Sequence, residues 1–261
     1  MMFQKSPLRY PGGKSRAVNS LYKFIPKNTK ELCSPFFGGG SFEIFCAQNG
    51  ISVYGYDNFQ PLVDFWKCLL EHPLELADSV EKYLPLKKEH FYKLQKIQLE
   101  SKSKLERATI FFVLNRTSFS GSTLSGGMAS GGENDNPRFT KSSIERLRNF
   151  KIQNLFVEFA NFNESISKHK NILLYLDPPY LIGNKLYGRK GDLHKAFDHE
   201  ELASILKKRE KWILSYNADS DKIRELYNDF QIEPLKWTYG MSKDKKSREI
   251  IIISHDIKSK K

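Results

Sequence analysis

The amino-acid sequence predicts an α/β fold in which helices cover both faces of a mostly parallel sheet. Short apolar runs of strand length alternate with amphipathic, helical stretches towards both ends of the chain. This alternation stops between residues 60 and 150, where the sequence is helical and charged and then rich in Gly and Ser. We therefore expect one sheet domain, built from residues 1–59 and 151–261, that is interrupted by an inserted, mainly helical module over 60–150.

Buried strands are expected where short apolar runs end in polar or special residues, over 31–36, 51–57, 154–162, 171–177, 211–217 and 249–255. Helices are expected over 198–210 and 218–230. Asp198 is a favourable N-cap for the first of these helices, and Glu201 stands where a capping box requires an acid. In sheets of this kind the ligand binds at the carboxyl ends of the strands.

The charge balance favours a polyanionic partner. Lys and Arg number 42 against 30 Asp and Glu, which gives a net charge of +12 at pH 7, and the isoelectric point is near 9.4. A basic surface gains free energy by releasing the counterions that are condensed on nucleic-acid phosphates. A basic protein without a nucleic-acid partner stays the alternative on charge alone.

The cysteines, histidines and apolar segments indicate the compartment. Cys33, Cys46 and Cys68 form no CxxC pair, so we expect reduced, packed thiols in a cytoplasmic protein. The histidines lack the spacing of a zinc site, and no metal is expected. No apolar run resembles a secretory signal or reaches the length of a membrane span, so no membrane contact is expected.

A glycine-rich turn follows the first predicted strand. In SPFFGGGSFEIF, Gly38 to Gly40 lie between that strand and a predicted helix. Glycine permits a tight turn and a close approach of a ligand to the backbone, and the first N–H groups of the helix can face a polar ligand. A plain structural turn is the alternative. No Lys-Ser/Thr pair follows the glycines, which excludes a phosphate-binding P-loop.

Asp57 ends the second predicted strand, about 17 residues after the glycines. A carboxylate in that position commonly accepts hydrogen bonds from both hydroxyls of a ribose. A helix N-cap is the other interpretation of Asp57. Together with the glycine turn, it favours a ribose-bearing cofactor.

The tetrapeptide Asp177-Pro178-Pro179-Tyr180 ends the fourth predicted strand. Proline fixes its own φ and restricts the preceding residue, so the Asp177 carboxylate and the Pro178 carbonyl are expected to point the same way. Two acceptors side by side suit the two N–H donors of an exocyclic amine. The Tyr180 ring offers a flat face on which a base can stack. A turn with an incidental tyrosine is the alternative.

In this order, LRYPGGK (8–14), SPFFGGGSFE (34–43) and DPPY (177–180) resemble the amino-methyltransferases that methylate N6 of adenine in DNA. The closest subgroup is the Dam-like, D12 class, and NRTSFSG (115–121) resembles the opening of its DNA-reading loop. The resemblance implies a Rossmann-like sheet that binds S-adenosylmethionine (SAM), with an inserted target-recognition domain. It also implies double-stranded DNA as the partner, a flipped-out adenine as the target, and no metal.

The resemblance assigns roles position by position. The catalytic residues would be Asp177, Pro178, Pro179 and Tyr180. The cofactor would be bound by Tyr10, Lys14, Pro35, Phe36, Gly38, Gly39, Gly40, Asp57, Asn161 and Asp177. The DNA would be contacted by Arg116, Ser118, Ser120 and Arg138.

The chain also departs from the family pattern. An acid usually precedes the Pro-Phe pair and contacts the amino group of the methionine part, but Ser34 stands there. Asn161 replaces an Asp that helps to seat the adenine ring of SAM, and its amide carbonyl is expected to take that role. The stretch typical of GATC-reading members is absent, so GATC specificity is not predicted.

Other functions stay open on sequence alone. One is an RNA methyltransferase that acts on N2 of guanine, and another is a DNA-binding homologue without turnover. A cytosine N4 enzyme would more often carry Ser at position 177. A cognate restriction endonuclease is a further expected partner in function, without physical contact. An Asp177 buried in a salt bridge and remote from the glycine turn would contradict the methyltransferase interpretation.

Overall fold

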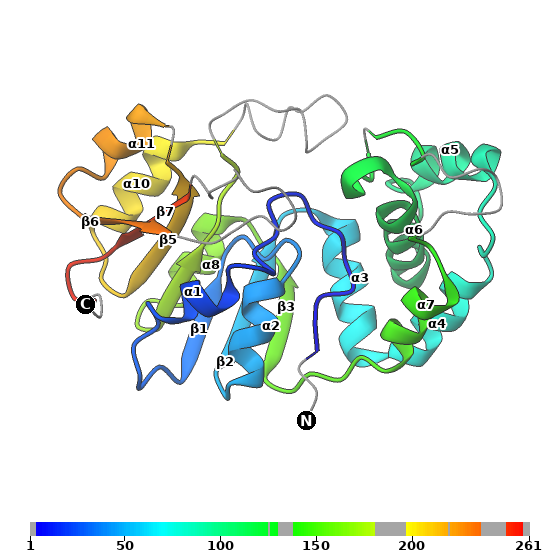
Figure 1. Cartoon of the computed structure of the whole chain (residues 1–261), viewed down its shortest axis with the longest axis horizontal. Helices are drawn as coiled ribbons and strands as arrows, with labels where there is room; N and C mark the ends of the chain where they lie inside the picture. Colours follow the sequence, from blue (N-terminus) through cyan, green and yellow to red (C-terminus); the bar gives the residue numbers. More distant parts are fainter. Residues whose placement is uncertain are drawn as a thin grey trace, which may run out of the picture.

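The computed structural model describes residues 4–124, 126–129, 138–180, 197–218, 220–235 and 249–257. Within these residues one seven-stranded sheet forms the centre of the sheet part (Figure 1). Its strands are β1 (Glu31–Ser34), β2 (Ser52–Asp57), β3 (Leu155–Phe159), β4 (Leu173–Leu176), β5 (Trp212–Asn217), β6 (Gln231–Leu235) and β7 (Glu249–Ile253).

The strand order is β3-β2-β1-β4-β5-β7-β6, and neighbouring strands from β3 to β5 are parallel. The chain moves outwards in one direction from β1 to β3 and in the other from β4 to β5. β1 and β4 therefore flank the switch point, where open α/β sheets bind their ligands. β7 is antiparallel to β5 and β6, and its first residue, Glu249, pairs with Asn217 at the end of β5. Glu249 consequently lies at the edge where the parallel strands end.

All six predicted strands are present, each shorter than its apolar run. β4 and β7 are buried throughout, as their continuous apolar sequences require. β6 was not predicted. Its sequence, QIEPL, carries a proline and is mostly exposed or half-buried, which is typical of a strand at the edge of a sheet.

The helices of the sheet part lie on both of its faces, because alternate strand residues point to opposite sides. Leu32 of β1 packs with residues of α1 and α2, whereas Cys33 packs with residues of α8, α10 and α11. The Asp198 carboxylate accepts a hydrogen bond from the Glu201 N–H, so the predicted cap is confirmed. The helices of the sheet part among the described residues are α1 (Val18–Tyr22), α2 (Ser41–Gln48), α8 (Phe162–Lys168), α10 (His199–Lys207) and α11 (Asp221–Leu226).

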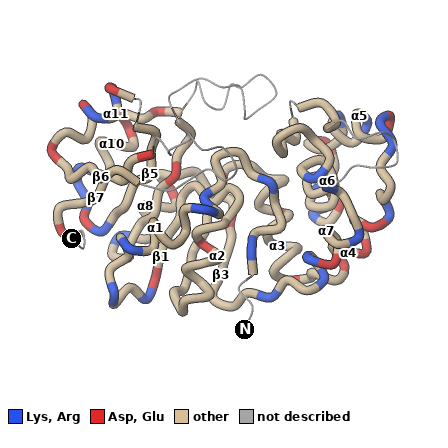
Figure 2. Tube along the Cα trace, in the orientation of Figure 1, with Lys and Arg blue, Asp and Glu red and all other residues tan. Residues whose placement is uncertain are grey.

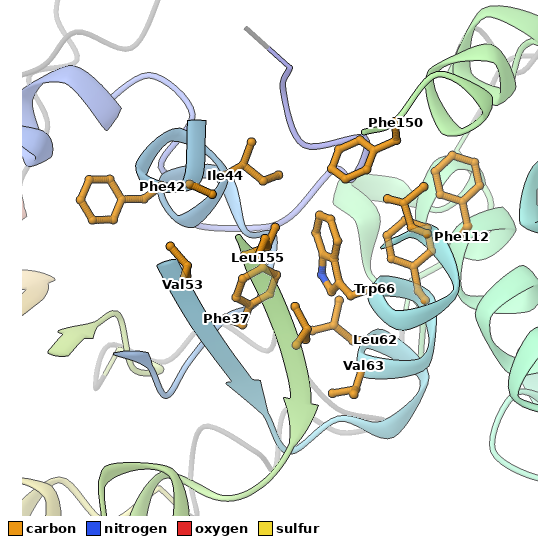
Figure 3. Close-up of a cluster of buried hydrophobic side chains, with 14 of the residues drawn as sticks. Phe37, Phe42, Ile44, Val53, Leu62, Val63, Trp66, Phe112, Phe150 and Leu155 are labelled. Carbon is orange, nitrogen blue, oxygen red and sulfur yellow. The ribbon is translucent and has the colours of Figure 1, made fainter. Parts of the chain in front are cut away.

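The segment between β2 and β3 is helical, as predicted, with α3 (Gln60–Glu71), α4 (Pro73–Glu81), α5 (Lys88–Ile97), α6 (Lys104–Thr117), η1 (Phe119–Gly121) and α7 (Lys141–Arg148). α3 belongs to both parts of the molecule. Figure 3 shows its residues Leu62 and Trp66 between Phe37 and Leu155 of the sheet part and Phe112 of α6. The core is therefore continuous across residue 60. The division at 60 and 150 stays a prediction, and it does not coincide with a break in packing.

The segment before α1 connects the helical module to the sheet part (Figure 1). The Arg9 N–H donates to Asn115 Oδ1 at 2.9 Å, and Asn115 Nδ2 donates to the Arg9 carbonyl at 2.8 Å. Gly121 is also packed here, because an added Cβ would lie 2.0 Å from the Arg9 carbonyl oxygen. NRTSFSG therefore anchors the segment that carries Tyr10 and Lys14, a structural role that its sequence did not reveal.

The three cysteines are buried free thiols, in agreement with the expected packing. Among the residues that the structure describes, no helix combines the length and the apolar character needed to cross a membrane.

Candidate active site

The carboxyl ends of β1, β2 and β4 border one cavity of about 550 Å³. Every residue that the sequence assigned to the cofactor or to catalysis lines this cavity. They are Tyr10, Lys14, Pro35, Phe36, Gly38, Gly39, Gly40, Asp57, Asn161, Asp177, Pro178, Pro179 and Tyr180. The volume lies within the range of small-molecule and cofactor sites.

The glycine turn forms one wall, and it requires glycine for two reasons. Gly38 and Gly40 have φ values of 48° and 63°, a left-handed conformation that favours glycine. The Tyr10 side chain also lies directly on the turn, since a Cβ at Gly39 would be 2.6 Å from Tyr10 Cβ. Tyr10 thus supports the turn from the N-terminal segment.

Asp57 is tied to the same turn. Its Oδ2 accepts the Gly38 N–H and its Oδ1 accepts the Phe59 N–H, each at 3.0 Å. Burial raises the pKa of this carboxyl to about 6, against the lowering effect of these backbone donors. Asp57 does not cap α3, whose N-cap position is Phe59. Each oxygen keeps a lone pair that can accept a further hydrogen bond.

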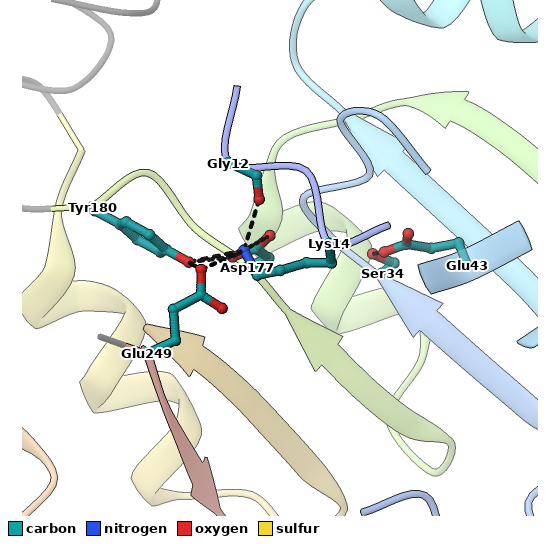
Figure 4. Close-up of polar contacts among 7 residues, drawn as sticks. All are labelled: Gly12, Lys14, Ser34, Glu43, Asp177, Tyr180 and Glu249. Carbon is teal, nitrogen blue, oxygen red and sulfur yellow. Dashed lines mark hydrogen bonds and ion pairs between the residues drawn. The ribbon is translucent and has the colours of Figure 1, made fainter. Parts of the chain in front are cut away.

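Lys14 and Asp177 form a buried ion pair at the centre of the site (Figure 4). Lys14 Nζ lies 2.8 Å from Asp177 Oδ1 and 2.7 Å from Oδ2, and it also donates to the Tyr180 hydroxyl and the Gly12 carbonyl. Burial lowers the pKa of Lys14, but Asp177, Tyr180 and Glu249 together raise it well above its ordinary value. Lys14 is therefore a charged group that holds the tetrapeptide from Asp177 to Tyr180, and its expected contact with the cofactor stays a prediction.

Asp177 is in a salt bridge, but not in the arrangement that would contradict a methyltransferase. Its side chain is 22% exposed and lies on the wall of the cavity that also holds the glycine turn. The carboxylate is thus accessible from the cavity while Lys14 fixes its direction.

Tyr180 is held from two sides. Its hydroxyl lies 3.2 Å from Asp177 Oδ1 and 3.4 Å from Glu249 Oε1. Its ring packs against Tyr216 with a centroid distance of 5.2 Å. The Tyr216 hydroxyl in turn donates to the Pro179 carbonyl at 3.3 Å. These contacts make the tetrapeptide rigid beyond the restriction that its two prolines impose.

The comparisons with known proteins agree with this geometry. The family model of the D12 class N6 adenine-specific DNA methyltransferases matches residues 10–241. The chain belongs to this family.

Two curated relatives of this D12 chain are a DNA N-6-adenine-methyltransferase of Escherichia phage P1 and Modification methylase LlaI of Lactococcus lactis subsp. lactis. The first is 26% identical over 255 residues, which are 89% of this chain and 32% of the relative. The second is 26% identical over 224 residues, which are 78% of this chain and 34% of the relative. The chain therefore spans about a third of the length of these relatives. The family and the α/β fold predicted from the sequence are confirmed.

The D12 site also contains acids that the sequence did not single out. Glu249 is 8% exposed, and its Oε1 lies 3.8 Å from Lys14 Nζ. It brings a second carboxylate to the Lys14 ammonium and to the Tyr180 hydroxyl. A lone acid at the start of the otherwise apolar strand EIIII was the signal that could have identified it.

Glu43 is the other acid that the sequence analysis missed. Its Oε1 accepts a hydrogen bond of 2.7 Å from the Ser34 hydroxyl, and the pair lies beside Lys14 (Figure 4). Burial raises the pKa of Glu43 to about 7.

An aromatic wall completes the cavity. Phe36 stacks on Phe162 with a centroid distance of 5.9 Å and meets Phe197 edge-on at 5.4 Å. Asn161 precedes this wall, but its amide carbonyl accepts the Glu164 N–H at 2.9 Å and caps α8. The expected contact of the Asn161 carbonyl with the adenine ring of SAM stays a prediction. The helix uses one lone pair of this oxygen, and the amide nitrogen is a second group that can face a ligand.

The four expected DNA-contacting residues do not line the cavity. Two of them, Arg116 and Ser118, lie among other residues of the protein in a way that suits a structural role. Arg116 donates to the Arg138 carbonyl at 2.7 Å and to the Pro7 carbonyl at 3.4 Å. Ser118 is fully buried, so the expected contact of its hydroxyl with DNA does not agree with the structure. Ser120 is half-buried with φ 55°, next to the Gly121–Leu124 stretch of the cavity wall, and Arg138 is half-buried.

Positive charge is concentrated around Arg116. Burial, followed by the charges of Arg146, Arg9 and Arg138, lowers its pKa to about 10. Figure 2 shows cationic positions along the segment before α1 and on the helical module, where acids are interspersed. No Asp or Glu precedes Glu31 in the sequence, so the N-terminal segment is uniformly basic. Residues 181–196, whose glycines and cations predict a flap over the base pocket, lie outside the described residues, as does most of the predicted DNA-reading loop after Leu124.

Proposed function

We propose that the chain transfers a methyl group from SAM to N6 of an adenine that is flipped out of double-stranded DNA. One observation carries the proposal. Asp177 and Tyr180 lie in the same cavity as the glycine turn and Asp57, at the carboxyl ends of three neighbouring strands. A group bound at the glycine turn and a base bound at Tyr180 would therefore meet within one enclosed space.

The residues of the cavity fit SAM. Asp57 keeps acceptor capacity for the ribose hydroxyls, and Phe36 and Phe162 give an apolar slot for the adenine ring. The amide nitrogen of Asn161 is available to donate to a ring nitrogen. The turn from Gly38 to Gly40 would lie along the methionine part. When bound, SAM supplies an electrophilic methyl group, and we expect no metal to take part.

The target adenine must leave the duplex before it can enter this cavity, at a cost of a few kcal/mol. Stacking on Tyr180 would recover about 1–3 kcal/mol of that cost. Because Tyr216 and the ion pair hold Tyr180 in place, little side-chain entropy is lost when the base binds.

Asp177 acts on the exocyclic amine. The N6 lone pair is delocalised into the ring, and a hydrogen bond from N6 to the Asp177 carboxylate favours its localisation on nitrogen. As N6 bonds to the methyl carbon, the bond from that carbon to the sulfonium sulfur would break, and S-adenosylhomocysteine would leave as a neutral thioether. Positive charge develops on N6 in this step, so its hydrogen bond to Asp177 strengthens in the transition state. N6 then gives up one proton, which Asp177 is positioned to accept. Lys14 orients the Asp177 carboxylate before the base arrives, because its ammonium donates to both carboxylate oxygens.

Duplex DNA is the proposed substrate because the chain carries a net charge of +12 and a basic N-terminal segment beside the cavity. We retain Ser120 and Arg138 as proposed DNA contacts. Arg116 is proposed to act indirectly, by holding Arg138 and the N-terminal segment in place. Ser118 is not carried into this proposal.

The test is transfer of tritiated methyl groups from SAM to unmethylated plasmid DNA, with tRNA and rRNA in parallel. We expect labelling of DNA alone, which Asp177→Ala abolishes and the exposed control Asp229→Ala does not change. Labelling of RNA alone would favour the guanine-N2 alternative. Tight DNA binding without labelling would favour a non-catalytic homologue.

Single-molecule sequencing of DNA from cells that express the chain would identify the methylated base and its sequence context. We further propose that the methylation protects DNA from a cognate restriction endonuclease, as the name of the Lactococcus relative suggests for that protein. Resistance of the methylated plasmid to a restriction enzyme with the same target would test this.

A further inference from the structure

Ser34 and Glu43 form a buried polar pair that neither the sequence motifs nor the proposed chemistry has used. Ser34 is the last residue of β1, and Glu43 is the third residue of α2. The Ser34 hydroxyl donates to Glu43 Oε1 at 2.7 Å. Ser34 is fully buried and Glu43 is 3% exposed, yet Glu43 lines the cavity.

A cation favours the ionised form of a carboxylate in such a position. Burying an ionised carboxylate without a positive partner is strongly unfavourable. None of the ion pairs between described residues includes Glu43. Lys14 is close enough to affect Glu43, but its ammonium is directed at Asp177 and Tyr180. The cavity therefore offers an acid whose charge is not neutralised by direct contact with any cation in the part of the chain that the structure describes.

We propose that Glu43 binds the α-ammonium group at the methionine end of SAM, and that Ser34 orients the Glu43 carboxylate for this contact. The inference rests on the proposed function, because it assumes that SAM is the ligand. In the family pattern an acid at the position of Ser34 contacts that amino group. In this chain the carboxylate is supplied nine residues later, from α2, and reaches the same place through its hydrogen bond to Ser34.

The position of Glu43 selects the ammonium group over the other cation of SAM, the sulfonium. An ammonium has N–H donors that a carboxylate can accept, whereas a sulfonium has none. Glu43 is also only three residues from Gly40, in the turn that would lie along the methionine part.

Binding should be coupled to a proton. Burial places the Glu43 pKa near 7, so part of the ligand-free protein carries a neutral Glu43 that must ionise when the ammonium binds. The other titratable and charged groups around it are Lys14, Cys46, Asp57, Tyr175, Asp177, Tyr180 and Glu249. Of these, Asp57 also has a pKa near the working range, at about 6.

The experiment is calorimetric titration of the full chain, and of its Glu43→Gln variant, with three ligands. These are S-adenosylhomocysteine, its analogue without the α-amino group, and 5′-methylthioadenosine. We expect Glu43→Gln to lower the affinity for S-adenosylhomocysteine by about 10- to 100-fold, which is the contribution of a hydrogen bond to a charged group. The affinities for the other two ligands should not change. The proposal would be overturned if the substitution lowered the affinities for all three ligands equally, or lowered none of them.

Two further measurements separate this proposal from a structural role. Binding of S-adenosylhomocysteine at pH 7, repeated in buffers of different ionisation enthalpy, should release a proton in the wild type that Glu43→Gln no longer releases. Equal proton release by both would overturn the proposal. Adding Ser34→Asp to Glu43→Gln restores an acid at the position used by the family. This double variant should bind S-adenosylhomocysteine at least about tenfold more tightly than Glu43→Gln alone. An unchanged affinity would contradict the view that Glu43 replaces an acid at the position of Ser34.

The same titrations distinguish the two levels of inference. A wild-type chain that binds neither S-adenosylhomocysteine nor 5′-methylthioadenosine would overturn the proposed function and this inference together. A wild-type chain that binds both ligands with the same affinity would leave the proposed function intact and overturn this inference alone.

Discussion

The ion pair between Lys14 and Asp177 should be strongly coupled in the stability of the chain. Lys14 is 4% and Asp177 22% exposed, and Lys14 Nζ lies within 2.8 Å of both carboxylate oxygens. Lys14→Met removes the ammonium that contacts Asp177 and Glu249, together with its hydrogen bonds to Tyr180 and Gly12. Removal of one partner of a buried pair costs about 3–5 kcal/mol, and we expect that loss for Lys14→Met.

The double-mutant cycle isolates the interaction. Asp177→Asn leaves the ammonium with Tyr180, Gly12 and Glu249, so we expect a smaller loss, about 2–3 kcal/mol. The double variant removes both charges, and its loss should fall about 2–4 kcal/mol short of the sum of the single losses. Urea unfolding followed by tryptophan fluorescence at pH 7.5 measures each free energy.

Lys104 and Glu71 provide a matched control, since their N–O distance is also 2.7 Å but their side chains are 40% and 50% exposed. Their coupling energy should not exceed about 1 kcal/mol. The raised pKa of Lys14 means that the contribution of its charge is present below its ordinary value of 10.5 and is lost only at higher pH. The coupling energy between Lys14 and Asp177 should therefore be the same at pH 7 and pH 9. Additive losses in the Lys14–Asp177 cycle would refute the view that Lys14 holds the Asp177 carboxylate.

Four other predictions follow from the same structure. Burial raises the pKa of Glu43 from 4.5 to about 7, so between these pH values the folded chain binds a proton that the unfolded chain does not. The unfolding free energy should therefore rise as pH falls from about 8 to 5, and Glu43→Gln should remove most of that rise in urea titrations. Gly55→Ala would place Cβ 2.1 Å from Phe37 Cδ2 and should destabilise the chain by about 1–3 kcal/mol, whereas Gly127→Ala, with 3.9 Å to its nearest atom, should change it by less than about 1 kcal/mol in the same assay. Glu249→Gln should slow methyl transfer by about tenfold without weakening S-adenosylhomocysteine, and an unchanged rate would show that this carboxylate does not position Lys14 and Tyr180. Affinity for any duplex should fall steeply between about 50 and 200 mM salt, and a flat response would contradict the proposed phosphate contacts.

The sequence alone was sufficient for the fold class, the approximate positions of six strands and the main motifs of the cavity. Each is a property of a contiguous segment: apolar runs define strands, Gly38 to Gly40 permit the turn, and two prolines stiffen the residue after β4. Because parallel strands end at one edge of the sheet, motifs that are far apart in sequence were expected to meet there, and they do.

Only the tertiary structure determined which groups satisfy one another inside that cavity. Glu249 reaches Tyr180 across 69 positions of sequence because β7 runs against its neighbours, and Lys14 reaches Asp177 across 163. Ser118 and Asn161 have side chains that suit a ligand, yet one is buried and the other caps a helix. The sequence shows which side chains are polar, but the packing of distant segments determines which hydrogen-bond partner each of them has. Whether a charge is neutralised and whether a polar group is buried depend on that partner, so both could be determined only from the folded chain.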